Sequence, residues 1–218
     1  MQVTRRRRWL IVDFERPQVM LSWAIHQGGK TNAKTVAWYQ VDAGEFGHVT
    51  DPKAFLRQKL QAASITDAVG LLTSANLGAY VETEKISGVL SATCIATVGL
   101  SNALRVGDPI RTTVPSKIGT INILCHVSMP LTEEAHLEAL SLVAEARSAA
   151  VLEADIQSTQ TGLQATGTGT DCIVMAAPNI DLDTTEPLRY VGKHTEAGHL
   201  IGQTVLKAMR RGIDLWHK

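Results

Sequence analysis

The apolar and polar positions along the chain predict a strand-rich protein. Two apolar runs at 9–14 and 19–25 precede a turn at 26–29, and a run of β-branched and aromatic residues follows at 34–41. Similar runs predict further strands at 68–73, 80–87, 89–98, 119–128, 155–158 and 166–177. Ser87-Gly88 provides the turn of a hairpin between two of these strands.

Three segments carry helical signals. Asp51-Pro52 is typical of an N-cap followed by a proline in the first turn, which predicts a helix over 52–63. Thr132 is the predicted N-cap of a helix over 133–152, and the last helix is predicted over 197–215. The middle helix carries a stripe of small residues, Ala135, Ala139, Val143, Ala146 and Ala150. Such a stripe allows a helix to pack closely on a sheet.

The order of these elements predicts an α+β fold. We expect a single layered domain over 9–218, with a largely antiparallel or mixed sheet packed by about three helices, because no linker or repeat divides the chain. A basic tail over 1–8 precedes it. The arginines at 5–8 favour a solvated, partly ordered N-terminus over an anion-binding site.

Composition excludes several classes of protein. Hydrophobic residues make up 44 % of the 218 positions and charged residues 19 %, so a sizeable core is expected and disorder is not. The formal net charge is zero, which argues against nucleic acid and anionic membranes as partners. The charged residues and Pro17 that follow the arginines interrupt any secretion signal, and the cysteines, Cys94, Cys125 and Cys172, lack CxxC spacing. We therefore expect a cytoplasmic protein with reduced thiols.

The stretch ATGTGTDC at 165–172 carries the most unusual chemistry. If the stretch is extended, its threonines share one face and Gly167, Gly169 and Asp171 share the other. If it is a loop, the glycines can take positive φ and their N–H groups can converge on an anion. Either form suits the wall of a substrate site, and a glycine-rich strand beneath the alanine-faced helix is the structural alternative.

An ordered set of segments carries a resemblance to a known family. The segments are GLLTSA at 70–75, GLSNA at 99–103 with GDP at 107–109, GTIN at 119–122, LTEEA at 131–135 with EARSAA at 145–150, ATGTGTD at 165–171 and YVGKHT at 190–195. Together they resemble the adenosylcobinamide amidohydrolase family over about residues 19 to 210. Arg147 stands where the family pattern leads us to expect lysine, and Gln27 lengthens the turn that contains Gly28-Gly29.

The resemblance implies a cytoplasmic enzyme of corrinoid salvage. Such enzymes hydrolyse the amide that joins the aminopropanol arm to the corrin ring of adenosylcobinamide. The partner is then a small-molecule corrinoid, no cofactor or metal is expected, and a homo-oligomer stays open. Polar loops at 99–118 and 178–194 have the composition to surround a large ligand that is rimmed with amides.

Amide hydrolysis needs an activated nucleophile, donors for the oxyanion and an acid for the leaving nitrogen. Asp171 is the candidate general base, or the residue that orients a base, and His194 is the candidate acid. Glu145 is a supporting carboxylate on the polar stripe of the middle helix, where a solvated face is the alternative. Cys172 is interpreted as an inert buried thiol rather than a nucleophile.

Further residues are candidates for binding the substrate. They are Thr168, Thr170, Gly167, Gly169, Asn122, Thr120, Thr73, Asn76 and Lys193. Each has a structural alternative, such as capping a strand end or remaining in solvent. Two rival functions stay open: a corrinoid-binding protein without catalysis, and a hydrolase of another small amide or ester that uses a threonine nucleophile.

Overall fold

The computed structural model describes residues 1–47, 49–110, 119–182 and 185–217. The strands are β1 (Gln2–Arg6), β2 (Trp9–Ser22), β3 (Gly29–Gln40), β4 (Ala68–Thr73), β5 (Val81–Ser87), β6 (Leu90–Val98), β7 (Ala103–Leu104), β8 (Ile121–Val127), β9 (Gly167–Thr168) and β10 (Cys172–Pro178). The helices are α1 (Ala43–Phe46), α2 (Pro52–Ala62), the 3-10 turn η1 (Leu77–Ala79), α3 (Glu133–Glu153) and α4 (Glu196–Trp216).

Most strands belong to one eight-stranded mixed sheet in the order β4-β3-β2-β10-β8-β6-β5, with β1 paired to β2. The pairs β3/β4 and β8/β10 are parallel, and β2/β3, β2/β10, β6/β8 and β5/β6 are antiparallel. This arrangement confirms the predicted α+β class and the mixed sheet. The short strands β7 and β9 pair separately.

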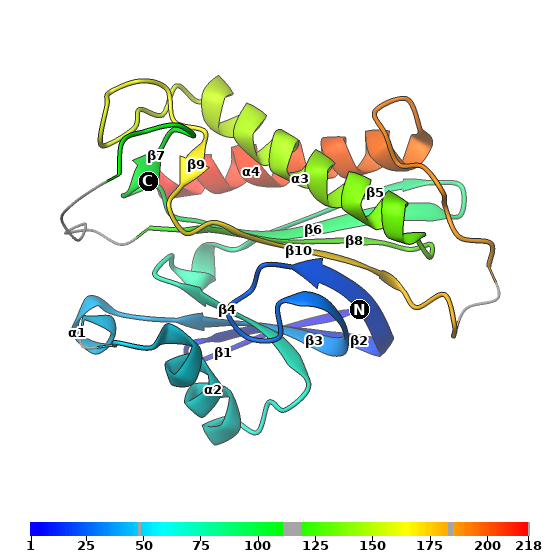
Figure 1. Cartoon of the computed structure of the whole chain (residues 1–218), viewed down its shortest axis with the longest axis horizontal. Helices are drawn as coiled ribbons and strands as arrows, with labels where there is room; N and C mark the ends of the chain where they lie inside the picture. Colours follow the sequence, from blue (N-terminus) through cyan, green and yellow to red (C-terminus); the bar gives the residue numbers. More distant parts are fainter. Residues whose placement is uncertain (48, 111–118, 183–184, 218) are drawn as a thin grey trace.

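The long strand β2 connects two halves of the sheet that stack on each other. Its residues 9–13 pair with β1 and β3, and its residues 18–22 pair with β10 and β3. The register shifts between Asp13 and Gln18, where Pro17 lacks the N–H that a regular ladder needs. Figure 1 shows the outcome: α3 and α4 cover the half made of β5, β6, β8 and β10, and α2 covers the half made of β3 and β4.

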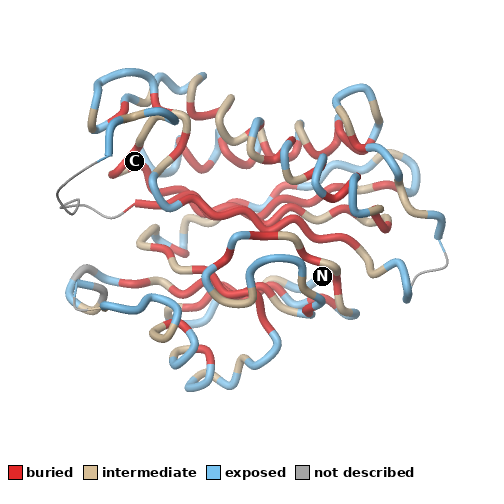
Figure 2. Tube along the Cα trace, viewed as in Figure 1, coloured by how far each residue is buried: buried red, intermediate tan, exposed pale blue. Residues whose placement is uncertain are grey.

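Both faces of the central strands are buried, as Figure 2 shows. On β2, Leu10 faces the space between the two halves, where it packs in one cluster with Leu124 of β8. The neighbouring Ile11 points the other way and packs in a cluster with Leu56 of α2. Successive side chains of a strand point to opposite faces, and in these strands both faces are buried. Apolar residues therefore follow one another without a break in the sequence.

The predicted helix starts are confirmed. The Asp51 side chain accepts hydrogen bonds from the N–H groups of Lys53 and Ala54, and the Thr132 hydroxyl accepts one from Ala135. The small-residue stripe of α3 is buried at every predicted position, Ala135, Ala139, Val143, Ala146 and Ala150. These residues pack against the β5–β10 half of the sheet in the largest core cluster.

Some of the sequence-based expectations need correction. The basic N-terminus over 1–8 is not a separate tail, because Gln2–Arg6 forms β1 and pairs antiparallel with β2. The reversal between them is built on Arg7, which has a φ of 52°. The runs at 9–14 and 19–25 form one strand that ends at Ser22. A strand depends on its partner for hydrogen bonds, so side-chain composition alone did not reveal these pairings.

The region after α3 also differs from the expectation. Residues 155–158 form only an isolated bridge between Gln157 and Gln164, and the predicted strand at 166–177 is divided into β9 and β10 by a turn. The predicted loop at 99–118 contains β7, and its residues 111–118 lie outside the described part of the chain, as do 183–184 of the loop at 178–194. Within the described ranges no helix is long and apolar enough to cross a membrane.

Two glycines of α4 make a matched test of the packing at the start of that helix. A Cβ on Gly198 would lie 2.2 Å from the carbonyl oxygens of Val191 and Gly192, whereas a Cβ on Gly202 would meet nothing within 4 Å. We expect Gly198→Ala to lower the free energy of unfolding by about 1–3 kcal/mol, as overpacking does. Gly202→Ala should raise it by about 0.5–1 kcal/mol, because alanine favours a helix. Urea unfolding measures both, and equal effects of the two substitutions would contradict this packing.

Candidate active site

A cavity of about 480 Å³ opens where the ends of the two stacked half-sheets meet. Its polar wall consists of Thr73, Ser74, Thr120, Asn122, Thr170 and Asp171. Its apolar wall consists of Trp23, Ile25, Val41, Pro52, Leu71 and Leu72, with Gly169 and Cys172 between the two. The cavity is therefore formed by the C-terminal end of β4, the N-terminal ends of β8 and β10, and the segments that follow β2 and β3.

The buried carboxylate of Asp171 organises the polar wall. Its Oδ1 accepts a hydrogen bond from the N–H of Ile121 at 3.1 Å and one from the hydroxyl of Thr168. Its Oδ2 accepts from the N–H of Thr168 at 2.9 Å and pairs with Nη1 of Arg147 at 2.5 Å. The Asp171 main-chain carbonyl accepts from the indole N–H of Trp23 at 2.6 Å. With both oxygens engaged, this carboxylate is arranged to hold the wall in place rather than to accept a proton from a substrate.

The glycine-rich stretch owes its shape to this carboxylate. Gly167 and Gly169 are absent from the glycines with positive φ, so the loop alternative with left-handed glycines does not hold. A Cβ on Gly167 would instead lie 2.2 Å from Oδ2 of Asp171 and 3.0 Å from Nη1 of Arg147. Glycine is needed here because the backbone passes directly against the ion pair.

Hydrogen bonds connect the polar wall across segments far apart in the sequence. The Thr120 hydroxyl donates to the carbonyl of Thr170 at 2.8 Å, and the Thr170 hydroxyl donates to Gly119 at 3.3 Å. The side-chain N–H of Asn122 donates to the carbonyl of Leu72 at 2.8 Å, which joins the two half-sheets. Thr73 accepts a bond from the N–H of Ala75 at 3.0 Å. The structure therefore brings Thr73, Thr120, Asn122, Gly169, Thr170 and Asp171 to one cavity, with Gly167 and Thr168 directly behind.

The other predicted site residues lie elsewhere. Asn76 caps η1, where its side chain accepts a bond from the N–H of Gly78. Lys193 and Glu145 form an exposed ion pair at 2.5 Å and line a shallow depression between α3 and α4. His194 is exposed in the turn before α4 and is not among the described residues that line the cavity.

The sheet register separates His194 from Asp171. Glu196, which follows His194 closely, contacts Ser87 at the closed end of the β5–β6 hairpin. Asp171 precedes Cys172, which pairs with Asn122 at the opposite end of β8. The seven residues of β8 rise by roughly 20 Å at about 3.3 Å per residue. The structure thus offers no support for the predicted acid–base pairing through one bridging water.

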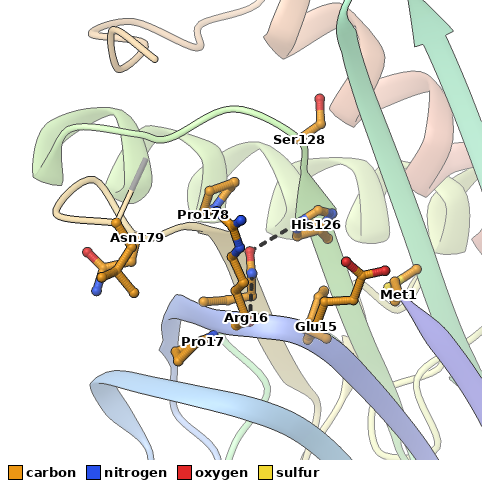
Figure 3. A pocket seen from close by; sticks show the side chains of 11 residues that line it. Met1, Glu15, Arg16, Pro17, His126, Ser128, Pro178 and Asn179 are labelled. Carbon is orange, nitrogen blue, oxygen red and sulfur yellow. Dashed lines mark hydrogen bonds between the residues drawn. The ribbon is translucent and has the colours of Figure 1, made fainter. Parts of the chain in front are cut away.

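A second cavity, of about 290 Å³, lies beside the bulge of β2 (Figure 3). Nε2 of His126 lies 3.2 Å from Oε1 of Gln18, and the ring packs at 5.1 Å from Phe14. Burial and the nearby N-terminal ammonium lower the pKa of His126 to about 4. The imidazole is therefore neutral at pH 7, and this cavity lacks the segments that line the larger one.

Sequence reasoning missed several residues of the larger site. Arg147 was noted only as a departure from a family pattern, yet it forms the buried ion pair with Asp171. Trp23 is 48 % exposed and lines the cavity, and its indole N–H is held by the carbonyl of Asp171. Thr97, which gave no sequence signal, is the register partner of Asn122, although it is not among the described residues that line the cavity. Among the described residues no group of three or more His, Cys, Asp or Glu is placed to hold a metal ion.

Comparisons with known proteins show which family the chain belongs to. The family model described as adenosylcobinamide amidohydrolase matches residues 1–218. An adenosylcobinamide amidohydrolase of Methanosarcina mazei is 28 % identical over 170 residues, which cover 75 % of this chain and 76 % of that protein. An uncharacterised protein of Methanocaldococcus jannaschii is 28 % identical over 223 residues, covering 92 % and 83 % respectively.

Among solved structures, the chain is similar to the L-aminopeptidase D-Ala-esterase/amidase of Ochrobactrum anthropi, a variant of the Ntn hydrolase fold. The TM-score is 0.44 at 10 % sequence identity, over 95 % of this chain and 77 % of that chain. The match to the family model defines the protein as a hydrolase that acts on an amide bond. The chain belongs to the adenosylcobinamide amidohydrolase family.

Gly167 and Gly169 provide a test of how the wall is built. Gly167→Ala should lower the free energy of unfolding by about 1–3 kcal/mol, because its methyl group collides with the Asp171–Arg147 pair. Gly169→Ala should cost much less, since its methyl group would meet only the flexible end of Leu104, at 3.1 Å. Thermal or urea unfolding of both variants checks this. A Gly167→Ala protein as stable as Gly169→Ala would show that the pair is not tightly enclosed.

The thiol at the cavity gives a second prediction. Burial raises the pKa of Cys172 to about 12, in agreement with the interpretation of an inert thiol. At pH 8 only about one molecule in 10,000 then carries the thiolate that reacts with alkylating agents. We expect iodoacetamide to leave Cys172 of the folded protein unmodified for hours at pH 8 and to modify it rapidly in urea. Peptide mass spectrometry measures this, and fast native alkylation would contradict the buried environment.

Proposed function

We propose that the protein hydrolyses the amide between the corrin side chain and the aminopropanol arm of adenosylcobinamide, giving adenosylcobyric acid and the amino alcohol. The observation that carries the proposal is a convergence in space. GLLTSA at 70–75, GTIN at 119–122 and ATGTGTD at 165–171 each contribute side chains to the same cavity. These segments are distant in the sequence, and each belongs to the set that resembles the family.

The size and character of the cavity suit one arm of a corrinoid. A volume of about 480 Å³ lies in the usual range for small-molecule sites, about 300–1,000 Å³, but is too small for a whole corrin ring. The amide arm therefore enters the cavity and the ring stays at its mouth. Trp23, Ile25 and Pro52 offer an apolar surface, and Trp23 and Ile25 are partly exposed.

The polar wall supplies what hydrolysis of the amide requires. The hydroxyl of Thr73 accepts from the N–H of Ala75 and keeps its own proton to donate to the oxyanion that forms from the amide. The protons of Thr120 and Thr170 already bond carbonyls of the wall, so these two hydroxyls offer acceptors for the amide N–H. Asp171 is the one carboxylate among the described lining residues, and its engaged oxygens favour the orienting role over the role of general base. Precise placement of these groups matters, because a misplacement of about 1 Å can cost about 100-fold in rate.

The decisive experiment measures turnover of adenosylcobinamide by the purified protein. Purified protein is incubated with adenosylcobinamide, and the formation of adenosylcobyric acid and aminopropanol is followed by chromatography and mass spectrometry. Asp171→Asn should lower kcat/KM by about 100-fold, since the wall loses its anchor. Arg210→Met, which removes an exposed ion pair with Glu153 away from the cavity, is the matched control and should retain activity. A visible spectral shift without release of aminopropanol would overturn the proposal in favour of a corrinoid-binding protein.

The same assay decides the role of His194. Because roughly 20 Å of strand separates it from Asp171, we expect His194→Gln to keep kcat/KM within a few-fold of the wild type. A loss comparable to that of Asp171→Asn, with an unchanged melting temperature, would restore the acid–base pair predicted from the sequence.

A further inference from the structure

Among the described residues, two polar atoms on the neighbouring strands β6 and β8 are buried between the half-sheets without a hydrogen-bond partner. They are Oδ1 of Asn122 and the hydroxyl oxygen of Thr97, and each residue is only 1 % exposed. Buried polar groups in folded proteins are nearly always paired, because an unpaired group loses its bonds to water and gains none. Valine at position 97 would fill the same space without this penalty. A pair of such atoms at one place lowers the stability of the fold unless another molecule pairs with them, which makes the pair a candidate contact for a ligand.

The sheet register brings the two side chains together. Thr97 of β6 and Asn122 of β8 are directly paired in the antiparallel ladder, so their side chains emerge on the same face about 5 Å apart. That face is the one between the half-sheets, because the next residues on the same side, Ile95 and Leu124, belong to the inter-sheet cluster. Asn122 also lines the cavity.

The hydrogen bond of Asn122 to the other half-sheet fixes which of its atoms is unpaired. Its Nδ2 donates to the carbonyl of Leu72, and a flipped side chain would set two oxygens against each other. Oδ1 of Asn122 is therefore a hydrogen-bond acceptor to which no described residue donates. The Thr97 hydroxyl beside it can donate a hydrogen bond. The two side chains present one acceptor and one donor. An alcohol has one proton to donate and an oxygen that accepts, so it can bond both.

We propose that Asn122 and Thr97 recognise the hydroxyl of the amino-alcohol arm, so that the enzyme selects amides of 2-hydroxyalkyl amines over plain alkylamides. The alcohol proton is donated to Oδ1 of Asn122, and the alcohol oxygen accepts the proton of Thr97. The inference rests on the proposed function and adds its specificity. It also changes the role of Asn122 from the predicted oxyanion donor to an acceptor for the arm.

The test compares adenosylcobinamide with its deoxy analogue, in which a propylamine replaces the aminopropanol. Sites that hydrogen-bond a substrate hydroxyl reject the analogue strongly, because their buried polar groups stay unpaired. We expect the wild type to prefer adenosylcobinamide by at least about 100-fold in kcat/KM. Equal rates on both substrates would overturn the inference and leave the proposed function intact. Hydrolysis of neither substrate would overturn both.

Variants of Thr97 give a sharper readout. Thr97→Val should lower the preference by about tenfold or more, mainly through slower hydrolysis of adenosylcobinamide, while raising the melting temperature, because an unpaired hydroxyl is replaced by a methyl group. Thr97→Ser, which keeps the hydroxyl, should keep most of the preference. An unchanged preference in a folded Thr97→Val protein would overturn the role of Thr97. It would mean that this space holds only water or stays empty.

Asn122→Leu provides a second, independent arm of the test. It should abolish the preference, although it also removes the bond to Leu72 that joins the half-sheets. If this variant does not fold, Thr97→Val still decides the matter. Inhibition by the free amines adds a readout that does not depend on turnover of the analogue. Aminopropanol should inhibit the wild type better than propylamine, and Thr97→Val should reduce that difference.

Discussion

The site of this protein depends on one buried carboxylate. Asp171 holds together elements that lie far apart in the sequence: Arg147 from α3, the first N–H group of β8, and Thr168 from β9. Through its carbonyl it also holds the indole of Trp23, beyond the end of β2. A buried ion has to be paired and hydrogen-bonded to be tolerated, so these segments are fixed relative to one another once Asp171 is in place. Gly167 follows from the same constraint, because no side chain fits between its backbone and the ion pair.

The location of the cavity follows from the stacking of the two half-sheets. Their central strands are buried on both faces, so apolar side chains fill the space between them along most of its length. At the end where β4 meets β8 and β10, polar residues replace them, and the packing gives way to a cavity. The bond from Asn122 to Leu72 spans the two halves at this point. A site placed there has a rigid backbone on both sides, which suits chemistry that depends on precise positioning.

The polar groups between the half-sheets differ in whether the protein itself supplies their hydrogen-bond partners. The carboxylate of Asp171 and the hydroxyls of Thr120 and Thr170 are bonded within the protein and shape the wall. In the described part of the chain, Oδ1 of Asn122 and the hydroxyl of Thr97 have no partner, and Nε of Arg147 has none either. Satisfied networks add rigidity, and unsatisfied atoms cost stability unless a ligand pairs with them. This contrast distinguishes the residues that build the site from those that we propose to contact the substrate arm.

The sequence by itself determined the local features. The N-caps Asp51 and Thr132 and the β5–β6 hairpin depend on interactions within a few residues, and the structure has them where the pattern predicted. The small-residue stripe of α3 follows from the period of the helix, and the structure buries it. The sequence also pointed to Asp171 and the glycines around it. Only the tertiary structure decided that Arg147 is the partner of Asp171 and that Trp23 lines the cavity. It also decided that Thr97 lies beside Asn122 and that His194 lies at the other end of the sheet. These relations depend on strand order and register, which are set by contacts between distant segments and leave no periodic trace in the sequence.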